Sequence, residues 1–195
     1  MGLTKHTDGG TFLTVMDGSL VQSHKEPKEG RTTTRVNKNG KTVHEEKFDV
    51  IEGLLVSLKT KDHETYGKQY ILGVQDGEDL FYINISQNSG SAVRFLKALP
   101  NVDLSKRVKL MPWSMADKVN PAKKIQGITM WQDGEKILPY YTKEEPNGLP
   151  EMKKVKIKGK DTYDSFEMDV FLEAMAQKMF EKVPAKEEAK TESPF

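Results

Sequence analysis

Residues 80–85, LFYINI, alternate between two sets of side chains. Such alternation is typical of a strand whose successive side chains point to opposite faces of a sheet. The apolar set Phe81, Ile83 and Ile85 is then expected in the core, so Tyr82 and Asn84 are expected to point outward. An outward tyrosine ring is a surface on which a nucleobase can stack, and each such contact is worth roughly 1–3 kcal/mol.

Residues 105–113, SKRVKLMPW, repeat this alternation with cations. Val108 and Leu110 predict the inward face of a second strand. The outward side chains are then Arg107, Lys109, Met111 and Trp113. This outward row combines positive charge, a thioether and an indole ring.

Rings between cations are what non-specific capture of a nucleic-acid single strand requires, because bases stack on the rings while cations follow the phosphates. Tyr70 alternates with Lys68 and could face either way. The candidate binding residues are Tyr70, Tyr82, Asn84, Arg107, Lys109, Trp113, Lys118, Lys123 and Lys124. The alternative is structural: a strand tyrosine packs half-buried on its neighbours, and Trp113 covers one end of a barrel.

An enzyme would need a set of catalytic groups, and the sequence does not assemble one. The four histidines lie in separate polar segments, and there is no cysteine, phosphate-binding glycine loop or nucleophile elbow. We therefore expect no catalytic residues, no metal site and no cofactor. A nuclease would require metal ligands that the sequence does not offer.

The elements that position these side chains predict a mainly β protein. Residues 48–86 are expected to form a three-stranded meander, with a bulge or bend at Gly53 and a turn at Asp76-Gly77. A short helix follows and ends at Pro100, and a strand and a hairpin around Asp133-Gly134 come next. Three strands, a helix and two strands is the order of an OB-fold, a five-stranded Greek-key barrel, here spanning 48–142. Another small barrel or an α+β sheet is the alternative.

The flanking segments are expected to be simpler. Residues 1–47 predict an N-terminal extension of two hairpins, around Asp17-Gly18 and Asn39-Gly40. Residues 143–163 predict a basic linker or flap, 164–183 a helix, and 184–195 a disordered tail. Asp164 or Ser165 is expected to cap the helix, with Glu167 completing a capping box. The apolar positions of the helix that keep helical spacing are Phe166, Val170, Ala174, Met175 and Met179.

Composition limits the kind of protein. The chain has 195 residues, and 30 lysines and arginines stand against 29 acidic residues. A net charge of +1 is not the strongly basic field of a typical duplex-DNA binder, so any nucleic-acid site must come from local patches. No apolar run is long enough for a membrane span, and the N-terminus lacks an apolar signal stretch. We expect a cytoplasmic protein that does not bind membranes.

The last five residues, TESPF, include Glu192, Pro194 and Phe195. A lone aromatic ring at the end of a polar tail is expected mainly to bind a partner protein. An expected OB-fold followed by such a tail resembles the single-stranded DNA-binding proteins of bacteria and their phages, and the chain is most similar to a diverged, phage-encoded member.

This resemblance implies a non-enzymatic protein that binds single-stranded DNA in replication, recombination or repair, in the host cytoplasm if it is phage-encoded. It also implies that Phe195 and its carboxylate anchor the tail on replication or recombination proteins. Pro194 would stiffen the approach, and Glu192 would supply negative charge. The tail would also compete with DNA for the protein's own basic groove.

Two other interpretations stay open. The chain could be a β-barrel protein-interaction module or phage accessory factor, or it could be an RNA-binding OB protein. The C-terminal helix could pack on the barrel or pair with another subunit, and the sequence leaves homo-oligomerisation undecided.

Overall fold

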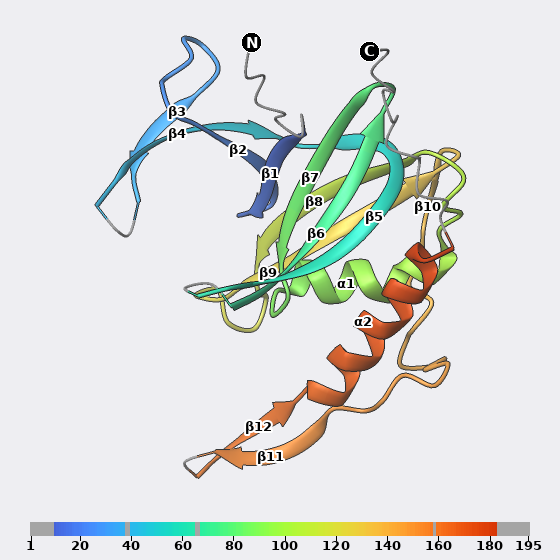
Figure 1. The fold of residues 1–195 in the computed structure, drawn as a ribbon. Helices are drawn as coiled ribbons and strands as arrows, with labels where there is room; N and C mark the ends of the chain where they lie inside the picture. Colours follow the sequence, from blue (N-terminus) through green and yellow to red (C-terminus); the bar gives the residue numbers. More distant parts are fainter. Residues whose placement is uncertain (1–9, 38–39, 65–66, 158, 183–195) are drawn as a thin grey trace, which may run out of the picture.

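The computed structural model describes residues 10–37, 40–64, 67–157 and 159–182 of the chain. The protein is mainly β with two α-helices, as the sequence predicts (Figure 1). A ten-stranded sheet forms most of the molecule, and a separate two-stranded ribbon projects beyond the N-terminal end of the C-terminal helix.

The centre of the sheet is the expected antiparallel meander. Its strands are β5 (Ile51–His63), β6 (Gly67–Asp76) and β7 (Asp79–Ser86). Gly53 is the last residue of β5 that pairs with β8, and pairing with β6 begins at Leu54. A Cβ atom at Gly53 would lie 2.5 Å from the carbonyl oxygen of Gln75, so only glycine fits where the strand changes partner. The register shift of the bulge itself falls between Leu55 and Ser57.

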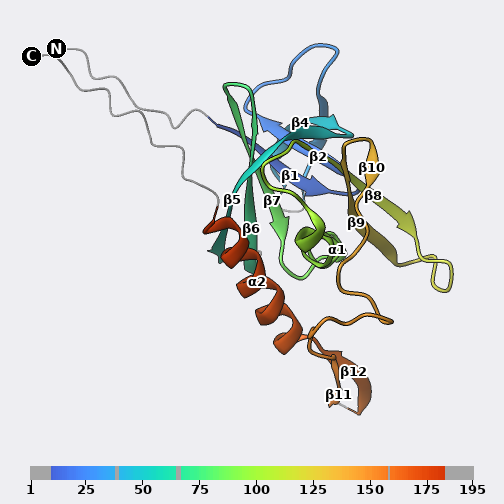
Figure 2. The ribbon, with the colours of Figure 1, turned by 90° about the vertical axis from the view of Figure 1, so that its right-hand side faces the viewer.

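The helix α1 (Gly90–Ala98) follows the meander and continues into a 3₁₀ turn, η1 (Leu99–Asn101), that contains Pro100. The hydroxyl oxygen of Ser89 caps the helix by accepting a hydrogen bond from the backbone N–H of Ala92 at 3.1 Å. Phe95 and Leu96 are buried in the core. Figure 2 shows α1 between the meander and the strands β8 and β9, with α2 on its outer side.

Strands β8 (Val108–Ala116) and β9 (Lys124–Gln132) form an antiparallel pair joined by residues 117–123. The expected turn at Asp133-Gly134 has positive φ at both residues, 53° and 83°, and it leads into the short strand β10 (Glu135–Lys136). After β10 the chain leaves the sheet, and the backbone N–H of Tyr140 donates to the carbonyl of Lys97 at the end of α1.

The sheet is not closed into a barrel. Its strand order is β10-β9-β8-β5-β6-β7-β1-β2-β4-β3. Closing the expected five-stranded barrel would require β7 to pair with β9, and these strands do not pair within the described chain. That edge of β7 is instead paired in parallel with β1 (Thr11–Met16). The closed barrel expected from the sequence is therefore not established.

The N-terminal segment is more than an appendage. The β1–β2 hairpin, with β2 at Ser19–His24, turns at Asp17-Gly18 with φ values of 51° and 86°, as predicted. Leu13 and Leu20 of this hairpin are buried in the common core. Strands β3 (Thr33–Val36) and β4 (Thr42–Phe48) form the second expected hairpin, whose turn residue Asn39 lies outside the described residues.

The segment 143–163 contains an element that its composition does not suggest. Strands β11 (Lys153–Ile157) and β12 (Lys160–Asp164) pair as an antiparallel ribbon. Within the expected linker or flap, irregular chain therefore leads into a paired ribbon. Lysines at 153, 154 and 156 made the segment resemble a solvated linker and obscured the strand.

The C-terminal helix α2 spans Phe166–Phe180. Ser165 is its N-cap residue, but the side chain donates to Asp169 at 2.7 Å, and Asp164 accepts from the backbone N–H of Phe166 instead. The expected capping box is absent. The buried face does not include Phe166, Val170 or Ala174, which keep helical spacing but are exposed. It consists of Met168, Leu172, Ala176 and Phe180.

Candidate nucleic-acid interface

Tyr82 points away from the core, as predicted, and a second ring lies beside it. Phe12 of β1 is the parallel partner of Tyr82, and the two rings stack with centroids 5.1 Å apart at an interplanar angle of 27°. A Cβ atom at Gly10 would lie 2.4 Å from the Tyr82 ring, so the glycine backbone lies against that ring. Phe12 remains 57% exposed. Tyr82 therefore supports the ring of Phe12, which offers the more open surface.

Asn84 lies next along β7 on the same outer face, opposite Thr14 of β1. Its side-chain amide donates to the carbonyl oxygen of Leu13 at 3.4 Å, a long hydrogen bond. A groove of about 560 Å³ opens here, within the range of ligand pockets. Its polar lining comes from Thr14, Ser23, Glu45, His63, Gln69, Asn84 and Ser86.

The hairpin strands β2 and β4 contribute one wall of this groove. Glu45 is buried there, and its two carboxylate oxygens accept hydrogen bonds from the guanidinium of Arg35 at 2.6 and 2.8 Å. The charge of Glu45 is therefore neutralised, and the groove does not repel an anion through this carboxylate.

Two lysines that the sequence analysis did not single out share the outer face of the meander. Lys59 pairs with Ile71, which in turn pairs with Asn84, so the three side chains form one row across the sheet. Lys61, Gln69 and Ser86 form the next row. Both lysines are exposed, so cations lie across the strands from the groove.

The outer face of β8 carries the second part of the expected surface. Val108 and Leu110 are buried, whereas Lys109 and Met111 are exposed, as predicted. Trp113 is half-buried, and its ring lies over Gly127, where a Cβ atom would come within 2.5 Å of it. The guanidinium carbon of Arg94 lies 5.3 Å from the centroid of this indole, a cation–π contact from α1.

Trp131 is a further ring on this face. It is half-buried and lies directly across from Lys109 in the β8–β9 register. The alternation of side chains along β8 does not indicate which residue of β9 lies opposite Lys109. Only the register between the two strands places Trp131 there. Arg94 was also missed, because a helix residue beside a strand residue leaves no local signal in the sequence.

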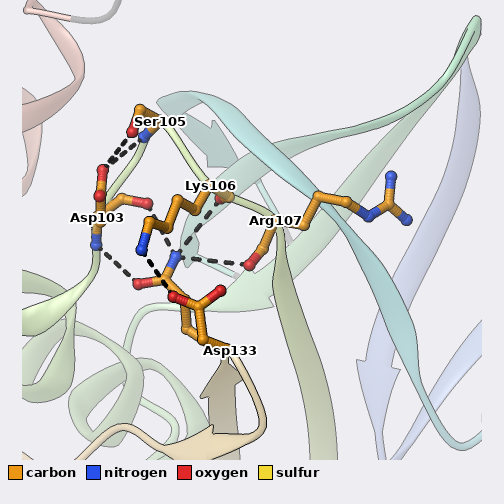
Figure 3. Close-up of polar contacts among 6 residues, drawn as sticks. Asp103, Ser105, Lys106, Arg107 and Asp133 are labelled. Atoms are coloured by element: carbon orange, nitrogen blue, oxygen red, sulfur yellow. Dashed lines mark hydrogen bonds and ion pairs between the residues drawn. The ribbon is translucent and has the colours of Figure 1, made fainter.

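Arg107 is exposed but already paired. Its guanidinium donates to Asp76 at 2.9 Å and lies 3.4 Å from Glu52, and the hydrogen bond to Asp76 raises the pKa of Arg107. Figure 3 shows this side chain pointing away from a neighbouring polar cluster in which Lys106 pairs with Asp133 at 2.7 Å. A phosphate would have to compete with two carboxylates for Arg107.

The three lysines in and beside the β8–β9 loop also differ in whether a carboxylate already binds them. Lys124 donates to Asp17 at 2.7 Å, and this hydrogen bond lowers the pKa of the Asp17 carboxyl. Lys118 and Lys123 are exposed, and neither forms an ion pair within the described part of the chain. The Lys124–Asp17 contact places this loop at the tip of the β1–β2 hairpin, and Gly18 packs against the backbone of Ser114 there.

Tyr70 does not belong to this surface. It pairs with Ile85 on the inner face of the meander and is only 2% exposed. Burial raises the pKa of Tyr70 to about 12, and its hydroxyl interacts with Gln87 and Glu173. Alternation could not decide its direction, because residues 70–74 of β6 are buried almost continuously.

The candidate residues therefore fall into two groups. Tyr82 and Asn84 lie on β7, and Arg107, Lys109 and Trp113 lie on β8, with β5 and β6 between them in the sheet. The β1–β2 hairpin connects the groups, because β1 pairs with β7 while its turn contacts β8 and Lys124. Glu192, Pro194 and Phe195 lie outside the described residues.

Comparisons of the chain with protein-family models, curated proteins and solved structures found no match. Among the residues that the structure describes, no three histidine, aspartate or glutamate side chains gather as a metal site. No helix in the same part of the chain has the length and apolar character needed to cross a membrane.

Proposed function

We propose that this protein binds single-stranded DNA without enzymatic activity. The observation that carries the proposal is the Phe12–Tyr82 stack, a supported and exposed aromatic surface on the outer face of a sheet. Exposed rings on sheets are platforms for bases, because every base has a face that can stack whatever its sequence. The mechanism is therefore capture of unpaired strands with little sequence preference.

The surroundings of the stack support the same function. Asn84, Thr14 and the polar groove offer hydrogen-bond partners beside the rings, while Lys59 and Lys61 supply positive charge on the same face. Lys109, Lys118 and Lys123 extend the positive charge beyond the β1–β2 hairpin. A strand would stack on Phe12 and follow the hairpin toward the β8–β9 loop.

The proposal includes an OB-type description of residues 51–132. The order β5, β6, β7, α1, β8, β9 is the order of that fold, and β5 pairs with both β6 and β8 as its first strand does. In this description β1 occupies the edge of β7 that would otherwise close the barrel.

The proposal extends to a role in replication, recombination or repair. Glu192, Pro194 and Phe195 would bind proteins of those processes. A chain ending at Val183 tests this, because it should bind DNA at least as tightly as the full chain while losing such partners.

Fluorescence anisotropy tests the central claim. Labelled oligo-dT, a matched duplex and oligo-rU are titrated with the full chain, with Phe12→Ala, and with Val36→Ala, an exposed apolar control on β3. We expect oligo-dT to bind more tightly than the duplex, and Phe12→Ala to weaken binding by roughly 5- to 150-fold, equivalent to one lost stacking contact. Val36→Ala should bind as the wild type does.

Three outcomes would contradict the proposal. Absence of oligo-dT binding at low salt would exclude a single-strand function. Equal affinity for oligo-dT and the duplex would show that binding comes from electrostatic attraction to phosphates and not from stacking of unpaired bases. A clear preference for oligo-rU would make RNA the ligand.

A further inference from the structure

Arg94 of α1 reaches across strand β9 to the indole of Trp113 on β8, with its guanidinium carbon 5.3 Å from the ring centroid. Gly127 of β9 lies at the crossing. A Cβ atom there would come within 2.5 Å of the indole and 2.7 Å of Cδ of Arg94, so glycine leaves room for both side chains. A cation–π contact uses none of the N–H donors of a guanidinium, so those of Arg94 remain available to another partner.

A small cavity opens beside this contact. It has a volume of about 140 Å³, and its polar lining consists of Arg94, Thr129 and Lys136, with the indole of Trp113 and apolar side chains around them. No carboxylate of the described residues lines the cavity, and neither of its two cations forms an ion pair with a described residue. Pockets that enclose a whole small molecule measure about 300–1,000 Å³, so this cavity suits a single chemical group.

The charges around the cavity favour an anion. Burial lowers the pKa of Lys97, and the charge of Arg94, one helical turn away, lowers it further. A bound anion would offset this repulsion between like charges. Phosphate is the anion that these side chains suit best, because the planar guanidinium of Arg94 can donate to two phosphate oxygens at once while Lys136 adds a point charge.

One row of side chains connects the cavity to the proposed interface. Trp131 of β9 lies opposite Lys109 of β8 on one side and opposite Lys136 of β10 on the other. Residues paired across antiparallel strands share a face of the sheet, so a cation, an indole and a second cation follow one another to the edge of the sheet at β10. A ring between two cations is the arrangement that holds a base and the phosphates on either side of it.

We propose that this cavity binds one internal phosphate group of the bound single strand, held by Arg94 and Lys136, while the neighbouring base stacks on Trp131. The inference rests on the proposed single-stranded DNA function and extends the path of the strand from Lys109 to the edge of the sheet at β10. A phosphodiester inside the strand supplies the ligand, so no strand end is required.

Tryptophan fluorescence tests occupation of the cavity, because the sequence contains only two tryptophans. Trp131→Phe keeps a ring at that position and leaves Trp113, in the wall of the cavity, as the single reporter. We expect oligo-dT without terminal phosphates to change the Trp113 emission over the concentration range in which anisotropy shows binding. A 5′-phosphate should shift neither curve. Binding without a change in Trp113 emission, or a change that requires the 5′-phosphate, would overturn the proposal.

The salt dependence of oligo-dT binding tests the two cations. Arg94→Gln and Lys136→Gln should each reduce the slope of log affinity against log salt by about 0.7, whereas Arg94→Lys keeps the charge and should keep most of the slope. Lys178→Gln, in the last turn of α2, is the matched control and should leave the slope unchanged.

The outcomes separate this inference from the function on which it rests. If the wild type binds oligo-dT while Arg94→Gln and Lys136→Gln both keep its salt slope, the phosphate site is wrong and the proposed function stands. If the wild type does not bind oligo-dT at low salt, the proposed function is wrong and the strand phosphate site is wrong with it.

Discussion

The ammonium nitrogen of Lys68 lies 2.6 Å from Oε1 and 2.8 Å from Oε2 of Glu173, so one cation joins strand β6 to helix α2. The side chain of Glu173 is 14% exposed and that of Lys68 is 34% exposed. Gln87 also donates to this carboxylate, at 3.4 Å. The contact therefore ties α2 to the meander from the side of the helix that carries Glu173.

Replacing Glu173 with alanine should therefore destabilise the fold. Lys68 and Gln87 would lose their partner at a mostly buried site, and we expect the free energy of unfolding to fall by about 1–3 kcal/mol. Urea unfolding followed by circular dichroism measures the change. Lys106→Ala is the matched control, because its pair with Asp133 is exposed on both sides and is worth at most about 1 kcal/mol. Equal losses in the two variants would show that the Lys68–Glu173 pair does not anchor α2.

Tyr70 should make the protein sensitive to alkali. Its pKa is about 12 in the fold, compared with 10.0 for a free tyrosine, so the folded state holds this proton more tightly than the unfolded state does. The resulting stability is fully present below pH 10 and is lost as the pH rises from 10 to 12. Denaturant unfolding at several alkaline pH values should show this loss in the wild type.

Tyr70→Phe removes the titrating hydroxyl and provides the comparison. We expect its stability to fall less steeply than that of the wild type between pH 10 and 12. Parallel pH profiles of the two proteins would mean that another group is responsible.

The cations on the proposed interface should contribute unequally to DNA binding. Lys109, Lys118 and Lys123 are exposed and form no ion pair within the described residues, whereas Arg107 and Lys124 are held by carboxylates. Replacing a phosphate-binding lysine with glutamine should reduce the slope of log affinity against log salt by about 0.7 for a single strand. We expect this reduction for each unpaired lysine that reaches a phosphate, and a smaller one for Lys124→Gln.

Anisotropy titrations at four salt concentrations give these slopes. Lys178→Gln, in the last turn of α2 and away from both groups of interface residues, is the control for general loss of charge. If all of these substitutions reduced the slope equally, binding would follow net charge and not a defined surface.

Gly53→Ala should be strongly destabilising although it adds a single methyl group. The new Cβ would lie 2.5 Å from the carbonyl oxygen of Gln75 and 2.8 Å from a methyl group of Val74. Backbone cannot move aside as a flexible side chain can, so we expect a loss of about 1–3 kcal/mol. Thermal unfolding measures it, and Glu52→Ala, on the neighbouring exposed residue, should change stability little. An unchanged melting temperature for Gly53→Ala would show that β5 can change partner without glycine.

Local chemistry made several elements predictable from the sequence. Asp17-Gly18 and Asp133-Gly134 adopt the positive φ values that tight hairpins need. The dipeptide Asp-Gly predicts such a turn from the sequence alone. The alternation around Tyr82 was equally informative, because Ile83 and Ile85 are both buried. These features depend only on neighbours along the chain.

Features that depend on contacts between distant parts of the chain could not be predicted from the sequence. Phe12 is an ordinary residue of a short N-terminal strand, and only its parallel register with Tyr82 gives it a role. Helical spacing could not indicate which face of α2 is buried, because the helix is apolar on two sides: Phe166 and Val170 are exposed, whereas Met168 and Leu172 are buried. The helix also contacts β6 through Lys68 and Glu173, which are 105 positions apart and leave no local signal.

The parallel pairing of β1 with β7 also has a consequence for synthesis. Phe12 leaves the ribosome 70 residues before its partner Tyr82. At about 5–20 residues per second, β1 waits about 4–14 s for the strand on which it will lie. During that interval Phe12 and Leu13 have no meander to cover them. The proposed base-stacking surface therefore cannot form until Tyr82 has been synthesised, and until then the apolar side chains of β1 lack the strand that supports them.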